Sequence, residues 1–413
     1  MRVAYLCVDP GVPVFGTKGS SVHVQEVVRA FRERDMPVTV YCTRRGSDVP
    51  ADLHDLPVVE RTVAATESPA ERERAIASAA QSLADAAIED GCDLVYERYS
   101  LFSTASAVIA RATGSPVILE VNAPLIDEQR THRTLVDEAG ARADTTRVVT
   151  AATVVVCVSE PVAAWVRPFT TSPRRITVVA NGVNTRRIVP PAHSSVTTGF
   201  TVGFIGTLKP WHGVDVLIRA TARAESAARA NSGRLAAEPP WRLRIVGDGP
   251  ERAALRQLAS NYPLDVEFTG AVAPERVPEL LAGFDVAAAP YPAGQDQYFS
   301  PLKLYEYLSA GLPVVASAVG QIPTVIVDDC TGLLVPPGDE VALADALGRV
   351  NEDRALRVRL GRAARALAVE RHDWRTVVGR ILDQLSAADQ AQLKAGAADS
   401  FAPQPALLIG GRR

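Results

Sequence analysis

A lysine and a glutamate stand three positions apart in an apolar stretch of the sequence. Lys303 and Glu306 belong to residues 299–315, FSPLKLYEYLSAGLPVV, which otherwise have the pattern of a helix followed by a buried strand. Ser300 and Pro301 are typical first residues of a helix, so Lys303 falls in the first turn, where its charge opposes the helix dipole unless an anion binds there. Glu306, one turn later, could bind a vicinal diol. The alternative is a surface Lys–Glu pair worth about 0.2–0.5 kcal/mol.

Two further loops carry residues suited to a phosphate or nucleotide. Residues 203–213, GFIGTLKPWHG, run from a strand into a helix, with Lys209 and His212 just before the helix begins. Backbone N–H groups at a helix N-terminus bind anions, so this loop is a candidate phosphate site. A tight turn with an exposed lysine is the alternative. The turn VGDGP places Gly247 and Asp248 where a ligand could approach the backbone, although these residues also favour a simple turn.

The elements that must position these residues follow from the apolar pattern. Runs of strand length recur on both sides of residues 190–199, and most of them are separated by helical stretches. Strands with little polar alternation, spaced by helices, are typical of parallel sheets covered on both faces. We therefore expect an α/β protein with two facing, doubly wound, Rossmann-like domains, whose ligands bind where the carboxyl ends of both sheets meet.

Domain boundaries can be placed from the same pattern. We expect an N-terminal domain over residues 1–192, a linker over 193–199 that is rich in Ser and Thr, and a C-terminal domain over 200–372. A last helix over 373–389 should return to the N-terminal domain. Residues 390–413 are rich in Ala, Gly and Pro without periodicity, and we expect them to be disordered.

Composition argues against several classes of protein. The chain has 413 residues, a net charge of −3 and no block of Lys and Arg, so nucleic-acid binding is not expected. No apolar run reaches the roughly 18 residues of a membrane span, and the first residues do not resemble a signal peptide. Five widely spaced cysteines fit reduced thiols. We expect a cytoplasmic protein, or one peripheral to a membrane.

The order of the motifs resembles the C-terminal domain of glycosyltransferase family 4, retaining enzymes with two facing Rossmann-like domains (the GT-B fold). GTLKPWHG, VGDGP and SPLKLYEYLSAGLPVV follow in the family's order, and Ser159 and the NGVN sequence at 181–184 match shorter motifs. The resemblance spans nearly the whole chain. It implies transfer of a sugar from a nucleoside diphosphate sugar to a small-molecule, lipid or glycan acceptor, with no metal and no cofactor beyond that co-substrate.

The resemblance also implies roles for residues of the C-terminal domain. Glu306 matches the family glutamate that contacts the ribose, whereas Tyr298 replaces the glutamate that contacts the donor sugar, so sugar or acceptor contact at this position falls to Tyr298. Lys209 is the candidate catalytic cation. The remaining expected contacts are Thr207, His212, Ser300, Leu302 and Lys303 at the phosphates, and Gly247, Asp248, Pro290 and Tyr291 at the nucleotide.

In the N-terminal domain, the sequence FGTKGSSVHV resembles the family's glycine-rich loop. Gly19 and Ser20 would lie against the donor phosphate or the acceptor. The implied role is backbone N–H donation next to small side chains.

The opposite wall of the cleft is expected at the ends of two further strands. Arg98 stands where relatives often have histidine, and a guanidinium cannot act as a base near pH 7, so Glu97 is the better candidate for contact with an acceptor hydroxyl. Glu120 and Asn122 end the next strand and should line the same wall. A structural role is the alternative for each.

Other functions fit the same scaffold. A sugar-nucleotide epimerase would need paired carboxylates near the sugar, and an inactive nucleotide-sugar-binding protein is suggested by Tyr298 and Arg98 at familiar polar positions. A dehydrogenase is disfavoured because DPGVP follows the first strand where a Gly-x-Gly-x-x-Gly turn would be needed.

Overall fold

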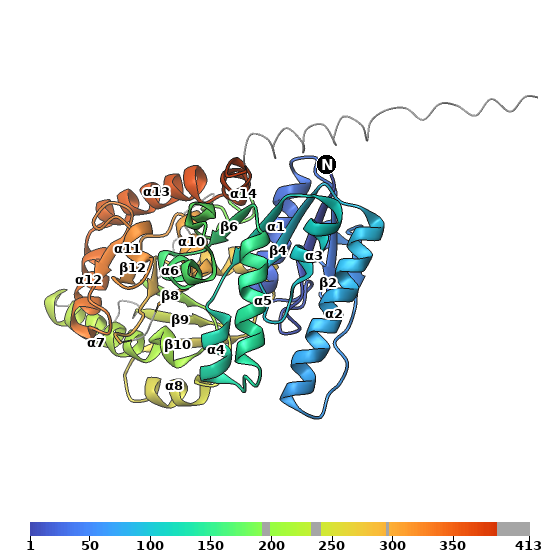
Figure 1. Cartoon of the computed structure of the whole chain (residues 1–413). Coiled ribbons are helices and arrows are strands. Elements are labelled where there is room, and N and C mark those ends of the chain that lie inside the picture. Colours follow the sequence, from blue (N-terminus) through green and yellow to red (C-terminus); the bar gives the residue numbers. More distant parts are fainter. Residues whose placement is uncertain (192–198, 233–240, 295–296, 386–413) are drawn as a thin grey trace, which may run out of the picture.

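Two parallel β-sheets, each with a hydrophobic core on both faces, form the computed structural model of the chain (Figure 1). The structure describes residues 1–191, 199–232, 241–294 and 297–385. The predicted linker, apart from Gly199, and the predicted tail lie outside these ranges, as does the end of the predicted last helix.

The N-terminal sheet has seven parallel strands in the order β3-β2-β1-β4-β5-β6-β7. They are β1 (Val3–Cys7), β2 (Val38–Cys42), β3 (Val58–Glu60), β4 (Leu94–Arg98), β5 (Val117–Val121), β6 (Val154–Cys157) and β7 (Ile176–Val178). Its helices are α1 (Gly19–Arg32), α2 (Pro69–Asp90), α3 (Ala105–Thr113), α4 (Leu125–His132), α5 (Glu138–Ala151) and α6 (Glu160–Val166). α1 covers one face of the sheet, and α2, α3, α5 and α6 cover the other.

The C-terminal sheet has six parallel strands in the order β10-β9-β8-β11-β12-β13. They are β8 (Thr201–Ile205), β9 (Arg242–Val246), β10 (Asp265–Gly270), β11 (Val286–Ala289), β12 (Val314–Ser317) and β13 (Leu333–Val335). Its helices are α7 (Val214–Ser232), α8 (Arg252–Ala259), α9 (Val277–Leu281), α10 (Leu302–Ser309), α11 (Ile322–Val325), α12 (Glu340–Glu352) and α13 (Arg354–Arg371). α7, α8 and α12 pack on one face, and α9, α10 and α11 on the other. α13 contributes Leu356 and Leu360 to the first of these cores and Ala364 and Ala368 to the second.

Local sequence accounts for many of these elements. All five residues of β1, β5 and β8 are buried, which explains why these strands lack polar alternation. α2 begins at Pro69 because the Ser68 hydroxyl accepts the N–H of Glu71, whose carboxylate accepts the N–H of Ser68 in return. The prediction of two doubly wound parallel sheets is confirmed; the short edge strand β3 was not predicted.

The final described helix, α14 (Trp374–Asp383), packs on the N-terminal domain. Trp374, Val377 and Ile381 belong to the hydrophobic core under α1, and α14 lies between α13 and that domain (Figure 1). The chain therefore crosses between the domains a second time. This second crossing adds contacts that hold the two sheets in their relative positions.

Candidate functional site

The N-termini of α1 and α10 meet between the two domains. A Cβ placed on Gly19, the first residue of α1, would lie 3.3 Å from the Leu302 methyl group at the start of α10. Leu302 also packs against the N-terminal core. Among the residues that the structure describes, no side chain caps the first turn of either helix. Uncapped N–H groups and two positive dipole ends therefore point into one region, which is suited to an anion.

Ser300 has a different role from the one predicted. α10 begins at Leu302 with Pro301 as its N-cap, so Ser300 does not cap the helix. Its hydroxyl accepts the backbone N–H of Asn181 at 3.1 Å and lies 2.7 Å from the Tyr305 hydroxyl. The serine therefore ties the loop before α10 to the N-terminal domain.

Lys303 is a buried cation without a hydrogen-bond partner among the described residues. Its ammonium lies 4.3 Å from the ring centroid of Phe204 and 5.5 Å from that of Tyr291. It also lies beside Gly206, where an added Cβ would approach Nζ to 2.7 Å. Burial lowers the pKa of Lys303 to about 7, against the opposing effect of Glu306. A phosphate would give this ammonium the partner that it lacks.

The two glycine turns and Pro290 pack backbone against backbone. Gly213 has φ +62°, and a Cβ there would lie 1.8 Å from the carbonyl oxygen of Pro290. Gly247 has φ +131°, and its Cβ would lie 2.0 Å from the carbonyl oxygen of Gly206. Only glycine fits these positions. The ends of β8, β9 and β11 are thereby brought together as one wall.

His212 is a poorer phosphate ligand than the sequence suggested. Its Nδ1 is bonded to the carbonyl oxygen of Thr207, so Nδ1–H is the donor and Nε2 remains an acceptor. Burial first, and then the nearby charge of Lys303, lowers the pKa of His212 to about 3. The ring is neutral near pH 7 and lies near Phe204 and Tyr291.

Two other predicted contacts lie toward the surface of this wall. Lys209 is partly exposed, with its ammonium 5.4 Å from the Trp211 ring centroid. The carboxylate of Asp248 accepts the N–H of Gly249 at 2.8 Å and pairs with Arg252 at 2.9 Å. Of the two lysines, Lys303 therefore has the buried position. Lys209 lies at the rim of this wall, where it remains a candidate for the catalytic cation.

Glu306 faces N-terminal residues that no motif had identified. Burial raises the pKa of Glu306, while Arg187 and Lys303 lower it and Glu26 adds to the rise. Arg187 lies 3.4 Å from Glu26, which also accepts a hydrogen bond from Asn184. Arg187 and Glu26 come from a loop and from α1, so only the folded chain brings them near Glu306.

A hydrogen-bonded cluster lies beneath α1 in the N-terminal domain. The buried carboxylate of Glu120 bonds to His23 Nε2 at 2.9 Å, to the Tyr96 hydroxyl at 2.7 Å and to Asn122 Nδ2 at 3.1 Å. Arg98 Nη1 lies 3.9 Å from it. Burial alone would raise the pKa of Glu120, but His23 first and then Arg98 and Tyr96 hold it at about 2. The Glu120 carboxylate thus holds together the side chains at the ends of β4 and β5.

Glu97 does not join that cluster. Successive residues of β4 point to opposite faces of the sheet, so Glu97 points away from the face that carries Tyr96 and Arg98. Its buried carboxylate accepts hydrogen bonds from the Ser103 hydroxyl and the Ser106 N–H near the start of α3. Burial raises its pKa. The structure therefore gives Glu97 a structural role in place of the predicted contact with an acceptor.

Tyr298 reaches across to the N-terminal domain. Its hydroxyl donates to the Glu128 carboxylate on α4, and its carbonyl oxygen accepts from the Ser159 hydroxyl. Burial, followed by the bond to Glu128, raises the pKa of Tyr298, so the hydroxyl stays protonated near neutral pH. No sequence signal had paired these residues.

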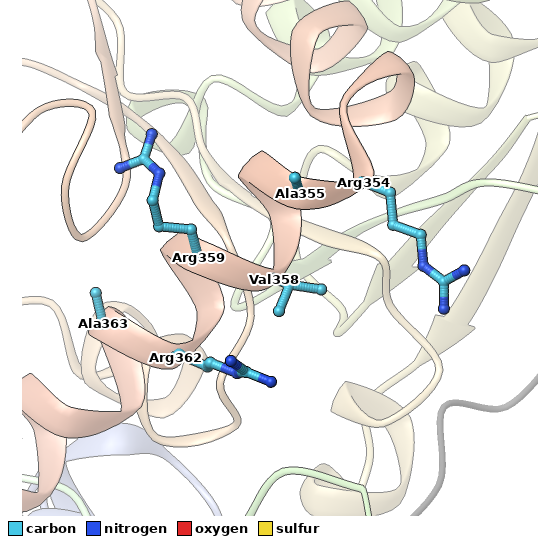
Figure 2. A pocket seen from close by; sticks show the side chains of 6 residues that line it. All are labelled: Arg354, Ala355, Val358, Arg359, Arg362 and Ala363. Atoms are coloured by element: carbon cyan, nitrogen blue, oxygen red, sulfur yellow. The ribbon is translucent and has the colours of Figure 1, made fainter.

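A separate hollow lies on the outer face of α13 (Figure 2). Its lining consists of Arg354, Ala355, Val358, Arg359, Arg362 and Ala363. All six residues come from one helix, and none is among the predicted site residues. The hollow is a surface feature of that helix.

Two family models match the chain. The one described as Glycosyltransferase Family 4 matches residues 17–187, and the one described as Glycosyl transferases group 1 matches residues 199–353. Together they match more than half of the chain and divide it where the two domains meet. The chain belongs to glycosyltransferase family 4. Its two sheets are the GT-B fold of that family.

Relatives of this family 4 chain include two proteins named D-inositol 3-phosphate glycosyltransferase. The protein from Saccharomonospora viridis is 31% identical over 53% of the chain, and the match spans only 51% of that protein's own length. The protein from Acidothermus cellulolyticus is 29% identical over 92% of the chain and 88% of its own length. Among solved structures, Anabaena HepE in complex with UDP superposes with a TM-score of 0.69 at 20% identity, over 94% of this chain and 100% of HepE.

Within the described ranges of this family 4 chain, no helix is both long and apolar enough to cross a bilayer.

Proposed function

We propose that the chain transfers a sugar from a nucleoside diphosphate sugar to a hydroxyl of an acceptor, with retention at the anomeric carbon and without a metal. The observation that carries this proposal is Lys303, a buried ammonium without a partner among the described residues where α1 and α10 both begin. The chemistry of this region matches a diphosphate. Nucleotide complexes of HepE, a protein of the same fold, support the choice of donor class.

The main catalytic task is to stabilise the leaving group. When the bond between the anomeric carbon and the β-phosphate oxygen breaks, negative charge grows on the phosphate. Lys303 and the N–H groups at Gly19, Ser20 and Leu302 are the nearby donors. Fixed donors in a site that excludes water stabilise such charge strongly, and losing one typically costs about 2.7–4 kcal/mol of barrier.

Glu306 is proposed to hold the ribose of the donor. It lies one turn after Lys303 on the same helix, and Arg187 and Lys303 both favour its charged form. A carboxylate accepts hydrogen bonds from both hydroxyls of a vicinal diol. The spacing of Lys303 and Glu306 would then match a phosphate and its neighbouring ribose.

Retention is favoured by the state of the candidate bases on the facing wall. An inverting reaction needs a carboxylate or histidine to take the acceptor proton. Glu97 is bonded to Ser103 and Ser106 on the far face, Glu120 is fully bonded, and Arg98 is a fixed cation. A departing phosphate oxygen can take the proton itself, on the face from which it leaves, and this route gives retention.

The acceptor is assigned only as a hydroxyl compound. The relatives' name, D-inositol 3-phosphate glycosyltransferase, makes a polyol phosphate the first acceptor to try. Arg98, whose Nη1 has no hydrogen-bond partner among the described residues, would suit such an anionic acceptor.

Purified protein incubated with a panel of labelled nucleotide sugars tests the proposal. One donor should be hydrolysed slowly without an acceptor and transferred when inositol phosphates or glycans are added, with the anomeric configuration kept by NMR. An isomerised donor would indicate an epimerase. Binding without turnover of any donor would indicate an inactive binding protein, and an inverted product would refute the proposed route.

A further inference from the structure

The loop that leads into α10 determines where Lys303 lies. Residues 297–301 join directly to Leu302 and Lys303, so any displacement of this loop moves the start of the helix and the ammonium with it. Lys303 has no hydrogen bond of its own among the described residues. Its position therefore depends on how the loop is held.

Three elements of the N-terminal domain hold this loop. The Ser159 hydroxyl, before α6, donates to the carbonyl oxygen of Tyr298. Asn181, after β7, bonds through its N–H to the Ser300 hydroxyl at 3.1 Å and through Nδ2 to the Ser300 carbonyl oxygen at 2.8 Å. On α4, Glu128 accepts the hydrogen bond of the Tyr298 hydroxyl.

The bond between Tyr298 and Glu128 differs from the other contacts. It is the one that joins two side chains, each from a different domain and one of them acidic, and hydrogen bonds to charged groups are the stronger class. Tyr298 also packs against the N-terminal core. The bond forms only while the two domains keep the arrangement seen here.

We propose that Tyr298 and Glu128 are a positioning pair, which holds the loop so that Lys303 lies where the donor diphosphate binds. This inference rests on the proposed function. Glu128 has no contact with the phosphate site in this scheme; it acts through Tyr298. The pair makes productive donor binding depend on closure of the two domains.

The test measures the affinity of a nucleoside diphosphate, UDP or GDP, by calorimetry. Tyr298→Phe and Glu128→Ala should each weaken binding by roughly tenfold, as expected for loss of a hydrogen bond to a charged group. Glu128→Gln keeps an acceptor oxygen but not the charge, and should recover part of the affinity. When Lys303→Met is already present, Tyr298→Phe should have a much smaller further effect, because the ammonium is gone and only the N–H of Leu302 is left to position.

Asp127→Ala is the matched control, since Asp127 is the residue before Glu128 and pairs with Arg130 at the surface at 2.9 Å. It should leave the affinity unchanged. Normal affinity in Tyr298→Phe, or a loss that adds fully to that of Lys303→Met, would overturn the proposal. If the unmodified protein binds neither UDP nor GDP nor any other nucleoside diphosphate, the proposed function fails instead, and the two failures are distinguishable.

Discussion

Two buried charged side chains, one in each domain, differ in whether the protein gives them hydrogen-bond partners. Glu120 in the N-terminal domain is 2% exposed and has hydrogen bonds from His23, Tyr96 and Asn122. His23 first, and then Arg98 and Tyr96, hold its pKa at about 2 against the effect of burial. Lys303 in the C-terminal domain is 9% exposed and has no hydrogen-bond partner among the described residues, and burial lowers its pKa to about 7. A paired buried charge maintains the fold, whereas an unpaired one is suited to a ligand.

Removing the paired charge should have the largest effect. Glu120→Ala leaves His23 and Arg98 without their shared carboxylate, and breaking a buried ion pair from one side costs about 3–5 kcal/mol. We expect the free energy of unfolding in urea to fall by about that amount. Unchanged stability would mean that the cluster is not the structural element inferred here.

The same carboxylate should make stability depend on acid pH. The pKa of Glu120 is lowered from 4.5 in the unfolded chain to about 2 in the folded chain, so its contribution is fully present above about pH 4.5 and is lost as pH falls toward 2. Urea unfolding of the unmodified protein and of Glu120→Gln between neutral and acid pH measures this. The difference between them should shrink as pH falls; a constant difference would contradict the assignment.

Removing the unpaired charge should affect function without weakening the fold. Lys303→Met keeps an unbranched side chain, one atom shorter, and removes an ammonium that has no hydrogen-bond partner among the described residues, so stability should hold or rise. Donor turnover should fall by roughly 100- to 1000-fold, as for loss of one donor to a developing oxyanion. Lys209→Met is the control at the rim, and a smaller fall is expected there. Equal losses of turnover in both variants would mean that the buried lysine has no greater role than the one at the rim.

Substitution of Glu306 should also impair function, but less than substitution of Lys303. Glu306→Gln removes the charge from the proposed ribose contact, which is worth about 1.5–3 kcal/mol. Binding of UDP or GDP should weaken accordingly, and that of a 2′,3′-dideoxynucleoside diphosphate should hardly change. Equal weakening for both nucleotides would remove the ribose from the assignment.

The fold could be predicted from the sequence because several of its central strands are buried along their whole length. β1, β5 and β8 read as continuous apolar runs, and the helix α2 has a capping box in its sequence. β3 was missed because its three residues, VVE, follow a proline and end in a charged residue, so they do not stand out as an apolar run.

The site was predicted less completely, for reasons of distance along the chain. Lys303 could be identified locally, as a positive charge in the first turn of a helix. Gly247 could be identified as part of a tight turn. The partners of Tyr298 and Glu306 did not, because Glu128 and Arg187 come from the other domain, more than 100 positions away. The choice between the two roles predicted for Glu97 could not be made from the sequence, because the face to which a strand residue points is fixed only by its place in the folded sheet.

The most direct test of the central claim is proton uptake when a nucleoside diphosphate binds. Burial lowers the pKa of Lys303 to about 7, so at about pH 8 most of the unbound protein should carry a neutral Lys303, and the diphosphate should restore the charge. Calorimetry of UDP or GDP in two buffers with different ionisation enthalpies should show uptake approaching one proton, which Lys303→Met abolishes together with much of the affinity. Equal affinity in both proteins, with no difference in proton uptake, would contradict the account.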